Sequence, residues 1–146
     1  MSIWKRQATV ADINALCKGT MCEHVGLVVT EIGDDYINAT MPVDYRTQQH
    51  MGIIHGGASV VLAETLGSIG AGMCCPEGFH IVGLDINANH IRAGKPPYVT
   101  GTTRPIHIGS STMVWEIRIT DVHDKLVCIS RLTCAVLKSG NKQAGT

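Results

Sequence analysis

The chain has 146 residues, of which 45% are hydrophobic and 16% charged. This balance predicts a folded protein with a sizeable core and excludes a disordered chain. Twelve basic and twelve acidic residues cancel, so the net charge gives no general attraction to nucleic acid or to a membrane surface. We therefore expect neither as a partner, and an anionic ligand must be held by a local basic cluster.

The N-terminal stretch MSIWKRQATV has basic residues but no apolar segment after them, so it does not have the pattern of a secretory signal peptide. The cysteines form no CxxC pair, which disfavours a zinc site and an easy disulfide framework. They stand at positions 17, 22, 74, 75, 128 and 134. We therefore expect reduced thiols, a cytoplasmic location, no metal and no separate cofactor.

The first predicted element is a short amphipathic helix over residues 9–19, with Thr9 as its N-cap. A β-hairpin is expected next, with strands over residues 27–32 and 36–41 around a Gly-Asp-Asp turn. A polar loop over residues 44–52 then leads into a long apolar segment.

The apolar segment predicts a buried helix from Gly57 to about Met73, because it is too long for a strand. As a membrane span it would place Glu64 near the bilayer centre, at a cost of about 2.5–3.5 kcal/mol. A core helix of a soluble domain is therefore favoured. Because a helix that is apolar nearly all round needs cover on several sides, and one sheet cannot wrap it, we also expect an oligomer.

Four strand-like runs follow the apolar segment, and the chain ends in a polar stretch. The runs cover residues 81–92, 98–107, 113–122 and 126–137, and residues 138–146 are expected to form a loose tail. This order predicts an α+β fold, in which an antiparallel sheet curves around one long helix. No linker or repeat divides the chain, so residues 1–146 are expected to form one domain.

Glu64 is the only charged residue between Gly57 and Cys75. Ser68 lies one helical turn further on, and Gly56 stands at the helix start, where unpaired N–H groups carry partial positive charge. This arrangement suits attack on a carbonyl group. The N–H groups would stabilise an oxyanion, and Glu64 would act as nucleophile or as general base toward water. The alternative is a structural glutamate that meets a basic partner or faces solvent at a subunit edge.

Several segments resemble the hotdog-fold acyl-CoA thioesterases. The resemblance rests on TQQHMGIIHGG, HGGASVVLAETLGS and VGLDINANHIR, and the segments MPVDYRTQ, RPIHIGSS and VCISRLTCAVL also fit. It extends from IWKR near the N-terminus to Leu137. The most similar branch contains the 1,4-dihydroxy-2-naphthoyl-CoA thioesterase of menaquinone synthesis and the proofreading thioesterase of enterobactin synthesis.

The resemblance implies a hotdog fold with active sites shared across a homodimer, and two dimers often forming a tetramer. It also implies a role for each residue of a catalytic set. Glu64 would be the catalytic carboxylate and Gln49 would position the substrate or water. His55 would lie near the thioester carbonyl, the Gly56 amide would polarise it, and Ser68 would support the carboxylate or water.

The sequence departs from the family pattern directly after the glutamine. It reads QQHMG from Gln48, where the relatives tend to carry proline and an aromatic residue. Gln48 is therefore an alternative to Gln49, although Gln49 has the family spacing of six residues before His55. The departure also places His50 and Met51 beside the expected acyl pocket.

A second group of residues is expected to bind coenzyme A. His90 and Arg92 are two positions apart, so they are predicted to share one strand face and to meet phosphate groups. The stretch HIGSS from His107 would offer donors to the same nucleotide. A solvated strand end and an ordinary hairpin turn are the structural alternatives. With these residues included, the complete expected substrate-binding set is Gly83, His90, Ile91, Arg92, Ala93, His107, Gly109, Ser110 and Ser111.

The leading hypothesis is a thioesterase that acts on an aromatic or medium-chain acyl-CoA, or on the same group held by an acyl or aryl carrier protein. A hotdog hydratase or dehydratase is one alternative, but those enzymes place a catalytic histidine and an acidic residue in a different motif. A non-catalytic acyl-CoA-binding protein is the other alternative, and it would not need Glu64.

Overall fold

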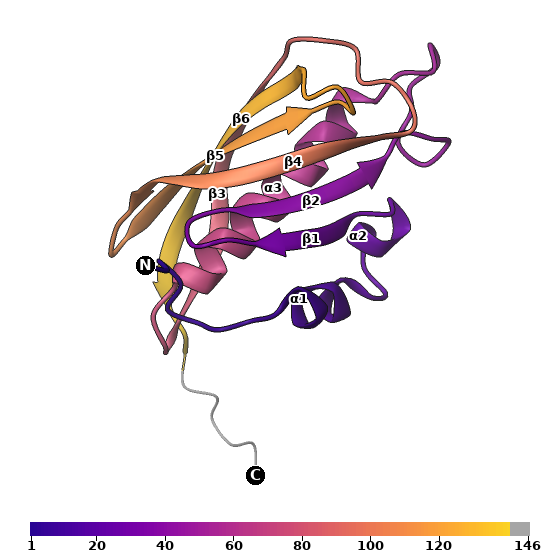
Figure 1. Cartoon of the computed structure of the whole chain (residues 1–146). Coiled ribbons are helices and arrows are strands. Elements are labelled where there is room, and N and C mark those ends of the chain that lie inside the picture. The colour runs from indigo at the N-terminus through magenta and orange to yellow at the C-terminus, as the bar shows by residue number, and fades with distance from the viewer. Residues whose placement is uncertain (141–146) are drawn as a thin grey trace.

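The computed structural model describes residues 1–140, in which a six-stranded sheet carries one long helix across one face (Figure 1). Its order is β1-β2-β4-β5-β6-β3, and every neighbouring pair is antiparallel. The elements are α1 (Val10–Cys17), α2 (Met21–His24), β1 (Val28–Ile32), β2 (Ile37–Pro42), α3 (Gly56–Cys74), β3 (Phe79–His90), β4 (Tyr98–Ile108), β5 (Thr112–Thr120) and β6 (Leu126–Lys138). The predicted α+β class is confirmed.

The core lies between α3 and the sheet, where the helix packs against β2, β3, β4, β5 and β6. Two glycines of α3 allow this close packing. A Cβ atom on Gly67 would lie 2.7 Å from a side-chain carbon of Leu132, and one on Gly70 would lie 2.7 Å from Trp115. Trp115 is fully buried and stacks on Trp4 with a centroid distance of 6.1 Å. Both tryptophans are therefore packing residues.

The central helix begins at Gly56, one residue before the predicted start, because His55 caps it. The imidazole Nδ1 of His55 accepts a hydrogen bond from the Gly57 N–H at 2.9 Å. The helix is long and apolar enough to cross a membrane by length and composition alone. This is weak evidence for a membrane span, because core helices of soluble proteins have the same length and composition. Half of the most apolar 18-residue stretch of the helix is buried inside the structure.

Two short helices precede the sheet. The first, α1, begins at the predicted cap, where Thr9 and Asp12 form a capping box. Hydrogen bonds from the Thr9 backbone and side chain hold the pKa of the Asp12 carboxyl below its usual value. The second, α2, was not predicted, because its four residues are too few to show a helical period.

The strand β3 lies two residues earlier in the chain than predicted. It ends at His90 because the N–H groups of Ile91 and Arg92 both donate to the Val127 carbonyl, at 2.8 and 3.2 Å, which turns the chain away from the sheet. The tail prediction was wrong at its start, since Lys138 still belongs to β6. The N–H of Ser139 donates to the Gly78 carbonyl at 2.8 Å, and residues 141–146 of the predicted tail lie outside the described residues.

One edge of the sheet is formed by β3, which is 12 residues long. Two of its apolar side chains face solvent, Val82 with 39% and Leu84 with 62% of its surface exposed. A long edge strand with free backbone groups and apolar side chains is a surface on which another strand can pair.

Candidate active site

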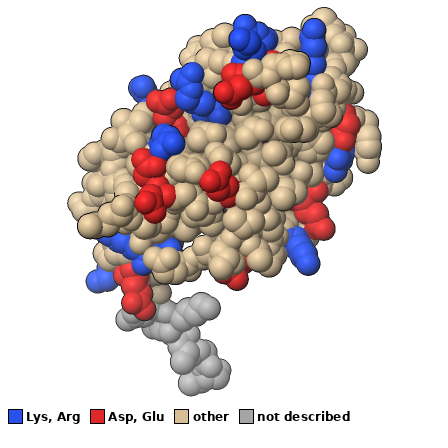
Figure 2. Space-filling model, in the orientation of Figure 1, with Lys and Arg blue, Asp and Glu red and all other residues tan. Residues whose placement is uncertain are grey.

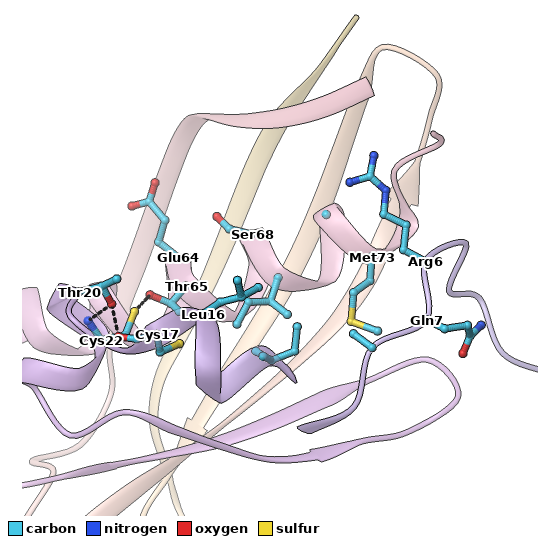
Figure 3. Close-up of a pocket in the computed structure, with 14 residues that line it drawn as sticks. Arg6, Gln7, Leu16, Cys17, Thr20, Cys22, Glu64, Thr65, Ser68 and Met73 are labelled. Carbon is cyan, nitrogen blue, oxygen red and sulfur yellow. Dashed lines mark hydrogen bonds between the residues drawn. The ribbon is translucent and has the colours of Figure 1, made fainter. Parts of the chain in front are cut away.

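A cavity of about 700 Å³ lies between α3 and the N-terminal part of the chain (Figure 3). Glu64 and Ser68 stand one turn apart on the α3 wall, and both side chains line the cavity. The opposite wall comes from α1 and includes Ile13, Leu16 and Cys17. The cavity is therefore mainly apolar and has a carboxylate near one end.

The Glu64 carboxylate lies against β3. A Cβ atom on Gly83 would be only 2.9 Å from its Oε1 atom. Within residues 1–140 Glu64 forms no ion pair, so the structural alternative of a basic partner is absent there, and the alternative of a glutamate that faces solvent at a subunit edge stays open. Cys134 is paired with Gly83 in the sheet. Burial raises the pKa of its thiol, and the negative charge of Glu64 raises it further, so this thiol stays neutral beside the carboxylate.

Two further thiols, Cys17 and Cys22, line the same cavity. Burial raises the pKa of the Cys17 thiol, and the neighbouring Cys22 raises it further. The sulfur of Cys22 lies 3.7 Å from the Thr65 hydroxyl. Because Cys17 is protonated at neutral pH, it acts as apolar lining rather than as a nucleophile. All six cysteines are free thiols, as expected.

The start of α3 leaves one backbone donor unused. The N–H of Gly57 donates to the His55 ring, and those of Ala58 and Ser59 donate to the His55 carbonyl at 2.9 and 3.2 Å. In the part of the chain that the structure describes, the Gly56 N–H has no acceptor. This free donor at a helix N-terminus is suited to a carbonyl oxygen that gains negative charge.

A second cavity of about 330 Å³ surrounds this donor. It is lined by Gln49, Gly56 and His90, among others. The His90 ring lies close to the helix start, since a Cβ atom on Gly56 would be 3.0 Å from its Nε2 atom. Gln48 is not part of the lining, and its side-chain amide donates to the Gly52 carbonyl at 3.3 Å. The structure thus brings Gln49, rather than Gln48, next to Gly56.

The predicted coenzyme A residues near the end of β3 also line this second cavity: Ile91, Arg92 and Ala93 join His90 there. The prediction that His90 and Arg92 share a strand face was wrong, because the strand ends at His90. The Arg92 guanidinium donates to the Leu126 carbonyl at 3.1 Å.

Of the other predicted substrate-binding residues, Gly83 lies on β3 beside Glu64. The remaining four lie in or beside the β4–β5 turn, at the far end of the sheet (Figure 1), and are His107, Gly109, Ser110 and Ser111. Thr112, directly after the turn, faces Ala135, which in turn faces Val82 of β3. His90 is eight residues further along β3, or roughly 26 Å away at the usual strand rise. Within one chain, the β4–β5 turn and His90 are therefore too far apart to contact the nucleotide of the same coenzyme A molecule.

The catalytic candidates of one chain are divided in the same way. Glu64 and Ser68 line the large cavity, whereas Gln49 and Gly56 line the small one. Gly56 and Glu64 are eight residues apart on α3, about 12 Å along the helix axis. His55, which lies between Gln49 and Gly56 in the sequence, is the N-cap of α3.

Sequence reasoning missed the N-terminal wall of the large cavity. The pattern of residues 9–19 gave an apolar face with Ile13, Leu16 and Cys17, but nothing in that pattern showed that it would cover α3. Figure 2 shows basic and acidic side chains interspersed on one face of the molecule, without a field of one sign, as the neutral net charge predicted.

Comparisons of this chain with known proteins all indicate the same family. The thioesterase superfamily matches residues 51–128. The 1,4-dihydroxy-2-naphthoyl-CoA hydrolase of Escherichia coli is 50% identical over 92% of this chain and 99% of its own length. A proofreading thioesterase of Cronobacter sakazakii is 47% identical over 92% of this chain and 98% of its own.

Solved structures agree with these relatives. A thioesterase of Haemophilus influenzae superposes with a TM-score of 0.93 at 44% identity, covering 97% of this chain and 99% of that one. A Staphylococcus aureus relative has 35% identity and a TM-score of 0.77, and the match covers about four-fifths of this chain and 98% of that one. Two mutant structures of this relative are known. In one a glutamine is replaced by alanine, in the other a glutamate is, and the two replaced residues are fifteen positions apart. The chain therefore belongs to the thioesterase superfamily, with the hotdog fold and the activity class of a thioester hydrolase.

Proposed function

We propose that this thioester hydrolase acts on acyl-CoA substrates with an aromatic or medium-chain acyl group. The observation that carries the proposal is the apolar cavity of about 700 Å³ that opens beside Glu64. An apolar cavity with a few polar groups at one end suits an acyl group whose thioester lies at that end. The relatives named as hydrolase and thioesterase do not favour the hydratase or the non-catalytic binding protein.

In the proposed reaction, Glu64 takes a proton from water as the water oxygen attacks the thioester carbon, or attacks that carbon itself to form an anhydride that water then hydrolyses. The free Gly56 N–H donates to the carbonyl oxygen as negative charge develops on it. The C–S bond breaks and releases the acid and the thiol of coenzyme A. No metal and no separate cofactor enters either route.

Gln49 is proposed to position the substrate or water. It lies fifteen positions before Glu64, which is the spacing between the glutamine and glutamate replaced in the two Staphylococcus aureus structures. Gln48 is sixteen positions away and does not line the Gly56 cavity. Both the spacing and the cavity therefore favour Gln49.

A homodimer formed through the β3 edge would complete the site. Pairing of two β3 strands around a two-fold axis is antiparallel, so each strand's start lies beside the other's end. This places the Glu64 half of one copy next to the Gly56 half of the other. It also moves the β4–β5 turn of one copy toward His90 and Arg92 of the other. We propose this dimer, alone or paired into a tetramer, as the active form.

The function is tested with purified protein and a panel of thioesters, which includes benzoyl-CoA, dihydroxynaphthoyl-CoA and saturated acyl-CoA from four to twelve carbons. We expect the highest kcat/KM for an aromatic or medium-chain member. The same acyl groups are also tested as thioesters of a carrier protein. Faster hydrolysis of these thioesters would show that the carrier protein, rather than coenzyme A, is the thiol component of the substrate. No hydrolysis of any member would contradict the proposal.

Arg92 is predicted to bind the phosphates of coenzyme A. Arg92→Ala should raise KM for acyl-CoA with a smaller change in kcat, because the phosphates are remote from the reacting carbonyl. The effect should weaken as salt is added, since exposed ion pairs are screened. Steady-state kinetics on acyl-CoA and on a short thioester without the nucleotide measure the difference.

Arg118→Ala is the matched control for this experiment, because it removes the same charge from an exposed site on β5. It should leave both substrates unaffected. Equal losses on both substrates for Arg92→Ala would show that Arg92 acts through its hydrogen bond to the Leu126 carbonyl, and would remove it from the binding site.

The cytoplasm is the proposed location, because six free thiols, four of them fully buried, fit a reducing compartment. Acyl-CoA is also a cytoplasmic substrate class, so the two proposals support each other.

A further inference from the structure

The helix α3 contains five glycines, and close packing accounts for four of them. A Cβ atom on Gly67 or Gly70 would clash with the side chain of Leu132 or Trp115. One on Gly56 or Gly57 would lie 3.0 Å from the ring of His90 or His55. In each case a neighbouring side chain occupies the space that a larger residue would need.

Gly72 is different from the other four. A Cβ atom built on it meets nothing within 4 Å, and its φ angle lies outside the left-handed region. Neither packing nor backbone conformation therefore requires a glycine here. Glycine is also unfavourable inside a helix, because it loses more backbone freedom on folding than alanine does. The structure gives no reason for this glycine other than the empty space beside it.

That space belongs to the cavity beside Glu64, because Gly72 is one of the residues that line it. Glu64, Ser68 and Gly72 follow one another at intervals of four residues along the same side of α3. Gly72 lies about 12 Å from Glu64 along the helix axis, a distance that an extended chain of roughly ten carbons spans.

The cavity is bounded at the Gly72 end by the N-terminal segment (Figure 3). The backbone N–H groups of Lys5 and Arg6 both donate to the Met73 carbonyl at 2.9 Å. The Arg6 guanidinium donates to the carbonyls of Pro76 and Phe79, at 2.9 and 2.6 Å. These bonds tie the segment to the end of α3. The cavity thus runs from the reacting carboxylate to a fixed wall.

We propose that Gly72 is a specificity-determining residue, whose missing side chain leaves room for the distal end of the acyl group. The inference rests on the proposed acyl-CoA hydrolysis. A larger residue at position 72 would shorten the cavity from its far end, about 12 Å along the helix from Glu64, and its Cβ atom would meet no neighbour within 4 Å. Short acyl groups would then be accepted as before, and long or bicyclic ones would be rejected.

Gly72→Leu tests this role on saturated acyl-CoA substrates from four to twelve carbons. Each methylene that loses its apolar site lowers kcat/KM about fourfold, so exclusion of three or four methylenes should cost about 100-fold for the longest substrates. Butanoyl-CoA should be hydrolysed as by the unchanged protein. Gly140→Leu is the matched control, because this glycine also has free space around it but lies outside the cavity. An equal loss at all chain lengths would overturn the inference.

A stability measurement gives a readout that does not depend on activity. Gly72→Ala should raise Tm by roughly 3–5 °C, because alanine is the better helix former and meets no neighbour. An unchanged or lower Tm would show that some packing requirement holds the glycine, and would overturn the argument from free space.

Binding separates this inference from the proposed function. If the unchanged protein hydrolyses no acyl-CoA, the proposed function fails, and calorimetry of the graded acyl-CoA series on Glu64→Gln protein still decides the role of Gly72. Adding Gly72→Leu should weaken binding of ten- and twelve-carbon acyl-CoA and spare butanoyl-CoA. Equal affinities with and without the leucine, or no binding of any length, would overturn the inference.

Discussion

Glu64→Gln will lower kcat by about 10²–10⁴-fold while leaving the fold and the assembly unchanged, as the loss of a general base typically does. Glutamine has the shape of glutamate, so it still fits beside Gly83, but its amide neither accepts a proton from water nor attacks a carbonyl. If Glu64 acts as nucleophile, the loss will be larger. Steady-state hydrolysis of the best substrate of the panel measures the effect, with circular dichroism and light scattering to verify the structure.

Glu77→Gln is the control for this loss, because Glu77 is exposed in the turn after α3 and lines neither cavity of the proposed site. It should retain full activity. A folded Glu64→Gln protein that hydrolyses thioesters at nearly the normal rate would exclude the proposed mechanism, whichever of its two routes is considered.

The features of the site that lie within one element were predictable. The apolar run gave the central helix, and a single charge within that run singled out Glu64, because a carboxylate rarely enters a core helix without a function. The start of the helix was misplaced by one residue because histidine is not among the usual N-caps. Its role depends on the ring nitrogen that accepts from the Gly57 N–H.

Features that depend on distant segments were not predictable. The wall formed by Leu16 and Cys17 requires α1 to lie across the cavity from a helix some fifty residues later in the chain. Only with that wall in place does Gly72 become a cavity residue rather than a weak point in a helix. Likewise, the separation of His107 from His90 follows from the order β4-β5-β6-β3, which the spacing of the strands in the sequence does not specify.

The proposed dimer predicts that two inactive variants restore each other. Light scattering should first give at least twice the chain mass of 15.6 kDa. Glu64→Gln and Gln49→Ala are then co-expressed with different tags. In a mixed dimer, one site combines the intact Glu64 of one copy with the intact Gln49 of the other, and the second site carries both changes. Random mixing makes half of the dimers mixed, so activity should recover to about a quarter of normal.

The control pairs Glu64→Gln with Glu64→Ala, which yields mixed dimers without any intact site and should recover nothing. Gln49→Ala and Glu64→Gln must each be slow alone, so the recovered rate should exceed both by at least about tenfold, given typical losses at such sites. Purification through both tags in turn isolates the mixed dimers, so that their fraction of the total protein is known. If isolated mixed dimers remain as slow as their parents, Glu64 and Gln49 act within one chain, and the β3 edge does not assemble the site.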